Sequence, residues 1–332
     1  MAPATAPIST RAESSGTRSL DYVVRSGVSG GVAGCAAKTL IAPLDRVKIL
    51  FQTGQPQFTH WAGTMLGLPR AATFITKTEG FWGLFRGHSA TLARIFPYAA
   101  IKFVAYEQIR SALIPSVEYE VHTRRFMVGS LAGLASVIFT YPLDVVRVQL
   151  AYTGSAPEVQ HARHRLIGTM EVMWHRAHAP SVFGRLSNFY PGFTPTLMGV
   201  IPYAGMSFFA HDLGHDIFRS KYLRQIAVRK NAKVAEGKQV PLQGWAELLA
   251  GGLSGIIAQT TAYPFEVIRR RMQVSGISGG HSCSVKSTIS AIYRELGMKG
   301  FFMGLSIGYI KVGPMAACSF YVYEKMKYLL AI

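Results

Sequence analysis

The chain has 332 residues, of which 35 are Lys or Arg and 17 are Asp or Glu, so its formal charge is +18. Charged residues make up only 16% of the sequence and hydrophobic residues 49%, which excludes a disordered chain. Three cysteines, odd in number and far apart, exclude a disulfide scaffold. A basic nucleic-acid-binding protein and a membrane protein with a positive interior both stay open at this point.

Long stretches without charge favour the membrane protein. Residues 126–143, 186–211 and 248–265 contain no Asp, Glu, Lys or Arg, and a bilayer-spanning helix needs ~20 mainly apolar residues. Three further segments are interrupted only by single bases: 26–44 by Lys38, 87–106 by Arg94 and Lys102, and 301–323 by Lys311. Bases at membrane depth tend to face a bundle interior or a water-filled cavity, although at helix ends they can also snorkel. We therefore predict six membrane helices around a polar pathway.

A motif of the form Pro-x-acid-x-x-base occurs three times, beginning at Pro43, Pro142 and Pro264. Each copy starts nine residues after the last glycine of a small-residue segment, and such segments let helices approach closely in a bilayer. An acid and a base three residues apart share one helical face. If three such helices converge, each acid can pair with the base of a neighbouring helix, whereas local pairing at a helix end is the alternative.

Two further elements recur with the motif. An aromatic-x-Gly turn follows it, ending at Gly87, Gly192 and Gly304, and such a turn before a helix exposes backbone N–H groups that can bind phosphate. An aromatic-acid-x-x-base segment comes later, at residues 106–110 and 323–327, and its middle copy departs from the pattern at 211–215. The chain is therefore built from three related units.

From about residue 20 to residue 330, these motifs together resemble the mitochondrial carrier family. The resemblance implies an all-α membrane protein with six transmembrane helices in three two-helix repeats, arranged with threefold pseudosymmetry around a substrate cavity. It also implies a transporter, not an enzyme, in the inner mitochondrial membrane, with both termini in the intermembrane space. We assign residues 1–19 to a disordered tail, with a transit peptide as the alternative, 20–115, 121–218 and 241–332 to the repeats, and 219–240 to a basic linker.

The resemblance further implies two gates. In the matrix gate, the three motifs would pair with one another, braced by glutamines, with Ala151 at the third brace position. Its residues are Asp45 with Arg147, Asp144 with Arg269, Glu266 with Lys48, and the braces Gln52 and Gln273. The cytoplasmic gate would comprise Tyr106, Glu107, Arg110, Asp212, His215, Tyr323, Glu324 and Lys327. His211 and His215 replace the expected aromatic residue and base, which suggests a weaker, pH-sensitive gate.

The family's substrate contact points match Arg94, the pair Gly199-Val200, and Lys311 in this sequence. Two cations and a small-aliphatic pair resemble the adenine-nucleotide branch, in which the small pair admits a flat base and the cations hold phosphates. We expect Lys38 and Lys102 to add positive charge to the cavity. Tyr203 could stack on an adenine or pack ordinarily between helices.

Local strings around these positions are similar to those of the coenzyme A carriers and the Graves' disease carrier group. We therefore predict that the protein moves coenzyme A into the matrix in exchange for an adenine nucleotide such as adenosine 3′,5′-diphosphate. A carrier for another adenine nucleotide (ATP-Mg/phosphate, ADP or AMP) is the alternative. The turns at Gly87, Gly192 and Gly304 resemble the family's cardiolipin sites. We expect a membrane-embedded monomer without a metal, cofactor or nucleic-acid partner.

Overall fold

The structure is a computed structural model that describes residues 19–64, 66–114, 121–153, 166–175, 182–220, 222–228, 242–277 and 284–330. Residues 1–18 of the predicted tail and most of the predicted basic linker lie outside this part of the chain. Within the described ranges the chain is helical, apart from turns and one isolated bridge between Val228 and Leu242. The predicted all-α architecture is thereby confirmed.

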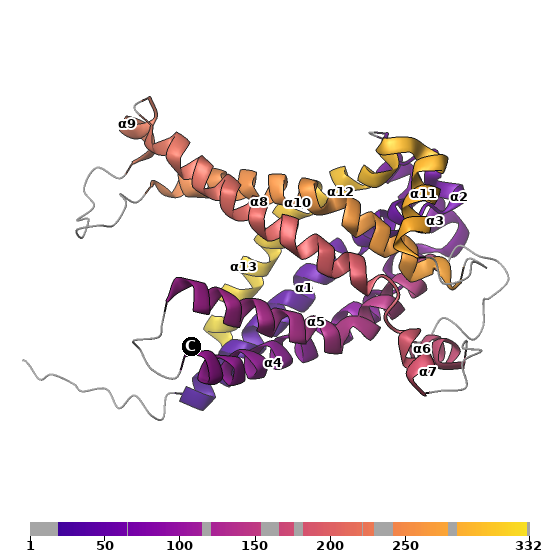
Figure 1. Cartoon of the computed structure of the whole chain (residues 1–332), viewed down its shortest axis with the longest axis horizontal. Helices are drawn as coiled ribbons and strands as arrows, with labels where there is room; N and C mark the ends of the chain where they lie inside the picture. Colours follow the sequence, from indigo (N-terminus) through magenta and orange to yellow (C-terminus); the bar gives the residue numbers. More distant parts are fainter. Residues whose placement is uncertain are drawn as a thin grey trace, which may run out of the picture.

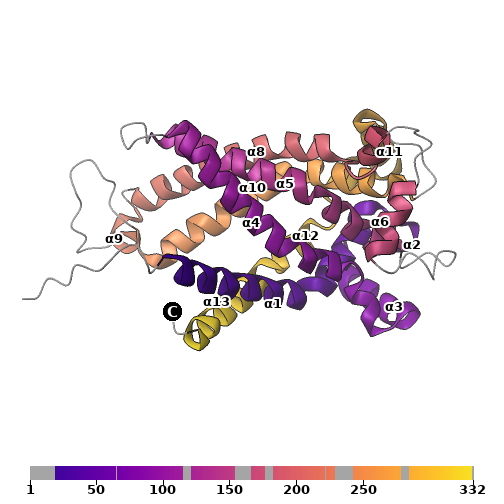
Figure 2. The same cartoon turned by 90° about the horizontal axis from the view of Figure 1, so that it is seen from below.

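Six long helices run between the two ends of the molecule (Figures 1 and 2). They are α1 (Ser19–Thr53), α4 (His88–Leu113), α5 (His122–Thr153), α8 (Phe193–Arg219), α10 (Gly244–Ser275) and α13 (Val312–Leu329). The most extensive contacts join α4 to α5, α8 to α10, and α13 to α1. Each of these pairs brings together helices from two different predicted repeats.

Several helices are suited to a bilayer. By length and composition, Arg25–Thr53, Met127–Thr153 and Val285–Leu329 could each cross a membrane. Helices α4, α8 and α10 have 26, 27 and 32 residues, which exceeds the ~20 residues that a span requires.

Two of the predicted spans are interrupted in the structure. The uncharged stretch 186–211 is divided between α7 (Val182–Ser187) and α8, which begins after Gly192 in a left-handed conformation with φ +77°. The sixth predicted span is divided at Lys311, between α12 (Leu305–Ile310) and α13. By contrast, Pro43, Pro142 and Pro264 all lie inside continuous helices.

Short helices of all three repeats gather at one end of the molecule (Figures 1 and 2). They are α2 (Pro56–Thr59), α3 (Gly67–Glu79), η1 (Phe81–Phe85), α6 (Leu166–His175), α7, α11 (Val285–Leu296) and η4 (Gly297–Phe302). The opposite end carries α9 (Arg224–Ala227) and lies near the C-terminus (Figure 1). Following the orientation expected from the sequence, we call these the matrix end and the cytoplasmic end.

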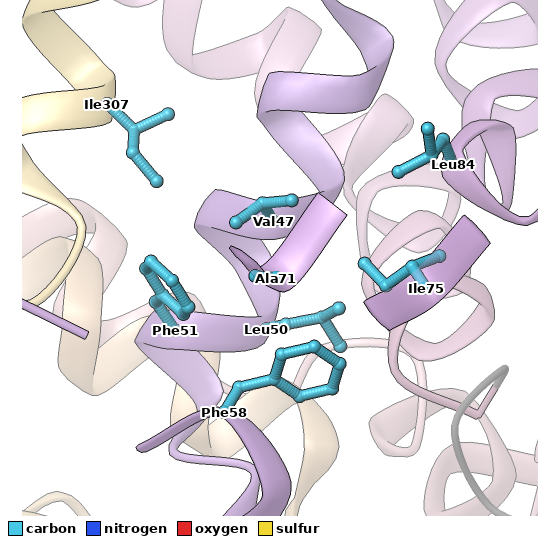
Figure 3. Packing of buried hydrophobic residues seen from close by; sticks show 8 residues of the cluster. All are labelled: Val47, Leu50, Phe51, Phe58, Ala71, Ile75, Leu84 and Ile307. Atoms are coloured by element: carbon cyan, nitrogen blue, oxygen red, sulfur yellow. The ribbon is translucent and has the colours of Figure 1, made fainter. Parts of the chain in front are cut away.

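Apolar clusters hold the matrix end together. In the first repeat, Leu50 and Phe51 of α1 pack with Phe58, Ile75 of α3 and Leu84 (Figure 3). Similar clusters lie around α5 and α10. A fourth cluster, which we call the three-helix cluster, joins α1, α5 and α10 directly, through Ile49, Val148, Ala151 and Val274. All of its members are buried, so these three helices converge just beyond the motif residues.

Candidate functional site

The acids and bases of the three motifs pair across the molecule. Arg147 of α5 lies 2.6 Å from Asp45 of α1, and Arg269 of α10 lies 2.8 Å from Asp144 of α5. Lys48 of α1 lies 2.9 Å from Glu266 of α10 and closes the ring. Each pair joins two of the three motif helices α1, α5 and α10, so the motifs do not pair locally as the alternative required.

Three more cations contact the same acids. Lys311 donates a hydrogen bond to Asp45 at 2.8 Å, and Arg94 lies 3.5 Å from Asp144. Lys311 and Arg94, both predicted to bind substrate, therefore pair with the acids of the motifs. Arg270, which sequence reasoning missed, also donates to Asp144 at 2.9 Å.

Glutamines and tyrosines connect the ion pairs to the surrounding backbone. Gln273 donates to Asp144 at 3.1 Å, and Gln52 donates to the hydroxyl of Tyr263 at 2.9 Å. That hydroxyl in turn donates to the Met303 carbonyl at 2.8 Å, and Tyr141 does the same to the Pro191 carbonyl at 2.9 Å. Both tyrosines immediately precede a motif proline. This shared position is the signal in the sequence from which both tyrosines could have been predicted.

The glycines of the three aromatic-x-Gly turns cap α4, α8 and α12 in the left-handed conformation, at φ +83°, +77° and +81°. A Cβ on Gly87 would lie 2.6 Å from the Arg147 carbonyl, and one on Gly192 would lie 2.8 Å from the Arg269 carbonyl. A Cβ on Gly304 would lie 3.2 Å from the Tyr263 hydroxyl and 3.6 Å from the Lys48 carbonyl, and the second of these is an ordinary contact. Gly87 and Gly192 therefore let a turn of one repeat pack against the motif base of the next.

A pocket of about 500 Å³ opens beside the first of these turns. Its lining combines aromatic rings, a cation and the start of α4: Trp82, Phe85, Arg86, Gly87, His88, Ser89, Leu92 and Leu150. An amphipathic anion with long apolar tails has matching chemistry.

The other predicted substrate residues are less closely tied to the ion pairs. Lys38 lines a small cavity with Asp45 and Arg147, and its Nζ lies 3.5 Å from the sulfur of Met315. A Cβ on Gly199 would lie 3.0 Å from the Cβ of Phe265 on α10, so close packing of the two helices also favours a small residue there. The side chains at the remaining positions are exposed, namely Val200, Tyr203 and Lys102.

The residues predicted to form the cytoplasmic gate are more exposed than the ion pairs at the matrix end. The Glu324 and Lys327 side chains lie 3.5 Å apart along α13, and the ammonium of Lys327 lies over the ring of Tyr323. On α8, the rings of His211 and His215 are 4.3 Å apart, and His211 lies 3.8 Å from Asp212. The remaining predicted members, Tyr106, Glu107 and Arg110, lie on the last turns of α4.

Positive charge exceeds negative charge around the ion pairs at the matrix end. Seven cations gather near three carboxylates, which leaves an excess of four positive charges. The cations are Lys38, Lys48, Arg94, Arg147, Arg269, Arg270 and Lys311, and the carboxylates are Asp45, Asp144 and Glu266. In the part of the chain that the structure describes, no group of His, Cys, Asp and Glu is suited to a metal ion. The excess of positive charge around these ion pairs is suited to holding a polyanion.

Comparison with known proteins gives matches along nearly the whole chain. The family described as "Mitochondrial carrier protein" matches three times, at residues 20–116, 120–222 and 240–331. The chain is 52% identical to "Mitochondrial carrier protein LEU5" of Saccharomyces cerevisiae, covering 95% of this chain and 92% of that protein. It is 38% identical to human "Solute carrier family 25 member 16", covering 92% and 88%. It is 35% identical to "Mitochondrial coenzyme A transporter SLC25A42" of Danio rerio, covering 96% and 91%.

Proposed function

Because the chain belongs to the mitochondrial carrier family, we propose that it carries coenzyme A into the matrix in exchange for an adenine nucleotide such as adenosine 3′,5′-diphosphate. As a member of this family, it is a transporter and not an enzyme, and a multi-pass protein of the inner mitochondrial membrane. The relative from Danio rerio is named as a coenzyme A transporter, which supports this choice of substrate.

The observation that carries the proposal is the excess of positive charge at the ion pairs. Charges removed from water need compensation by opposite charges, because desolvation is costly. Three carboxylates leave four of the seven cations there to be compensated by another anion. Coenzyme A carries a diphosphate and a 3′-phosphate, and its charge suits such a site.

The same geometry supports a mechanism for coupling substrate to the gate. In the structure, Arg94 lies on Asp144 and Lys311 lies on Asp45, and both acids also hold the cross-repeat pairs. A phosphate that binds Arg94 and Lys311 competes with the carboxylates of Asp144 and Asp45 for these two cations. We call the ion pairs of the three motifs, with their glutamine braces, the matrix network. Substrate binding then removes two cations from the acids of this network and lowers the free-energy cost of opening it. A ligand shifts such an equilibrium only through its differential affinity for the two states, and this competition provides one.

A ligand panel read by thermal shift tests the choice of substrate. A ligand that binds only the folded protein raises its melting temperature. We expect coenzyme A to give a larger shift than ADP or ATP-Mg at equal concentration, and adenosine 3′,5′-diphosphate to give a measurable one. A shift with ATP-Mg that equals or exceeds the coenzyme A shift would favour a carrier of another adenine nucleotide.

Arg94→Ala tests whether Arg94 belongs to the site. Asp144 keeps Arg269 and Arg270 in this variant, so the protein should still fold. We expect coenzyme A uptake into proteoliposomes to be lost while the melting temperature without ligand stays close to that of the wild type. Lys102→Ala, on the same helix but at an exposed position, is the matched control and should retain more uptake. Full uptake by Arg94→Ala would remove Arg94 from the substrate site.

We also propose that the turn at Gly87 binds cardiolipin. The adjacent pocket offers the aromatic residue Trp82 and the cation Arg86 beside the first residues of α4, where backbone N–H groups attract phosphate. The expected result is a higher melting temperature in detergent with added cardiolipin, and a smaller gain in Arg86→Gln. An equal gain in the variant would contradict binding at this turn.

A further inference from the structure

One buried arginine stands where the other two repeats have an aliphatic residue. Arg46 occupies the position before Val47 in the first motif, and the corresponding residues are Val145 and Val267. All three are buried, at 1%, 0% and 0% exposure. The two valines belong to apolar clusters. Because burying a charge is costly unless it is well paired, the first repeat requires a specific reason for its arginine.

The contacts of Arg46 reach three other elements. Its Nε donates to the Ala151 carbonyl of α5 at 3.3 Å, which crosses from the first repeat to the second. One terminal nitrogen donates to the Gly83 carbonyl of η1, and the other lies 2.7 Å from Glu79 of α3. Glu79 in turn lies 3.3 Å from Arg86. The guanidinium therefore ties α1 to α5, η1 and α3 at once.

Ala151, which accepts the hydrogen bond from Arg46 between the two repeats, stands at the position where the other repeats have a glutamine brace. Ala151 corresponds to Gln52 and Gln273, whose amides bridge the other two repeat interfaces by bonding to Tyr263 and Asp144. The position matching Tyr141 and Tyr263 is also an alanine in the first repeat, Ala42. The interface between repeats one and two thus has neither the glutamine nor the tyrosine. A small cavity lies there, lined in part by Ala42, Arg46 and Arg147.

We propose that Arg46, positioned by Glu79, is the third brace of the matrix network and replaces the missing glutamine through the backbone carbonyl of Ala151. The inference rests on the proposed function, because it assigns Arg46 to the closed state of the matrix gate. When α1 and α5 separate, the Arg46–Ala151 bond must break. Since Glu79 belongs to α3, this short helix is then part of the gate at the first interface.

A thiol-accessibility experiment tests the proposal without any substrate. The three native cysteines are changed to serine, and Val274→Cys is introduced as a reporter in the three-helix cluster, where Val274 is 4% exposed. The protein is placed in lipid nanodiscs, and the rate of labelling by a water-soluble maleimide is measured. Opening of the matrix network exposes this position, so the rate reports the open population.

We expect Arg46→Met to raise the labelling rate about tenfold, the equilibrium equivalent of losing a hydrogen bond to a charged group. Glu79 keeps Arg86 as a partner, so this change does not leave a carboxylate without a cation. Adding Ala151→Gln to Arg46→Met restores the missing glutamine and should return the rate to within about threefold of the parent. If Arg46→Met does not fold, Arg46→Gln takes its place in both measurements.

Arg271→Met is the matched control, because Arg271 also ties a long helix to its short matrix helix, by pairing with Glu295 of α11. It should change the rate much less than Arg46→Met does. An unchanged rate in folded Arg46→Met, an equal rise in Arg271→Met, or no recovery with Ala151→Gln overturns the proposal. Asp144→Asn separates the two levels of inference. If it alone raises the rate, only the role of Arg46 fails, and if it too has no effect, the proposed gate itself fails.

Discussion

The two ends of the molecule carry acids and bases at similar helical spacing, yet their environments differ. At the matrix end, the side chains of Asp45 and Asp144 are 9% and 3% exposed and lie 2.6–2.9 Å from bases of other helices. At the cytoplasmic end, the side chains of Asp212 and Glu324 are 81% and 68% exposed, and the partners they contact, His211 at 3.8 Å and Lys327 at 3.5 Å, lie on their own helices.

This difference shows that an acid-base spacing does not by itself decide how strongly charges interact. The matrix-end motifs lie where α1, α5 and α10 converge, and the three-helix cluster excludes water just beyond them. Removing one partner of an ion pair in such a buried setting is strongly destabilising, whereas exposed pairs contribute only about 0–1 kcal/mol to stability. The structure therefore holds a formed network of buried ion pairs at the matrix end, whereas the ion pair of Glu324 with Lys327 at the cytoplasmic end is exposed and lies within one helix.

The largest expected effect comes from removing one matrix-end charge. Asp144→Asn leaves Arg94, Arg269 and Arg270 close together without their shared carboxylate. Breaking a buried pair in this way costs about 3–5 kcal/mol. We expect a clear fall in the melting temperature measured in detergent, together with loss of transport in proteoliposomes.

Asp212→Asn is the matching change at the other end. Its side chain is 81% exposed, so the expected cost is less than about 0.5 kcal/mol. Equal falls in melting temperature for the two variants would show that the ends do not differ energetically as their exposure implies.

Repetition in the sequence is what made the matrix network predictable. The pairs of Asp45 with Arg147 and Glu266 with Lys48 follow from placing three motifs of the same form around one axis, as the family resemblance implies. The all-α fold and the three repeats follow from the same periodicity and are confirmed by the structure and the comparisons. Any feature that all three repeats share leaves a signal that one sequence can reveal.

Features present in only one repeat could not be found in this way. Arg270 corresponds to Ile49 and Val148 in the other repeats, and Arg46 corresponds to two valines. A search for shared motifs discards such positions, although both arginines make bonds within or across the matrix network. The contacts of Lys311 and Arg94 with the motif acids could not be predicted either, because they depend on how closely α13 approaches α1 and how closely α4 approaches α5. A single charge at an otherwise aliphatic position is the signal that could have identified Arg46 and Arg270.

A second, smaller effect tests whether close packing at the matrix end extends beyond the charges. In Gly192→Ala, the new Cβ would lie 2.8 Å from the Arg269 carbonyl, and the backbone would stay at φ +77°. Strain of this kind costs about 1–3 kcal/mol. Thermal unfolding in detergent should show a corresponding loss of stability.

Gly205→Ala, on the same helix, meets no atom within 4 Å and is the control. It should be neutral or slightly stabilising, because alanine is the better helix former. Similar losses in both variants would mean that α8 is sensitive to any added side chain and that the turn at Gly192 is not specially packed.

The smallest effect is expected at the cytoplasmic end. Glu324→Gln removes an exposed pair with Lys327 three residues along the same helix, and such pairs contribute about 0.2–0.5 kcal/mol. Because exposed charges are screened by salt, the difference in melting temperature between variant and wild type should vanish at high ionic strength. A salt-resistant loss as large as that of Gly192→Ala would show that Glu324 is held in a desolvated network in the resting protein. The two ends would then be closed together, and substrate could enter the cavity only after a prior opening of the cytoplasmic end.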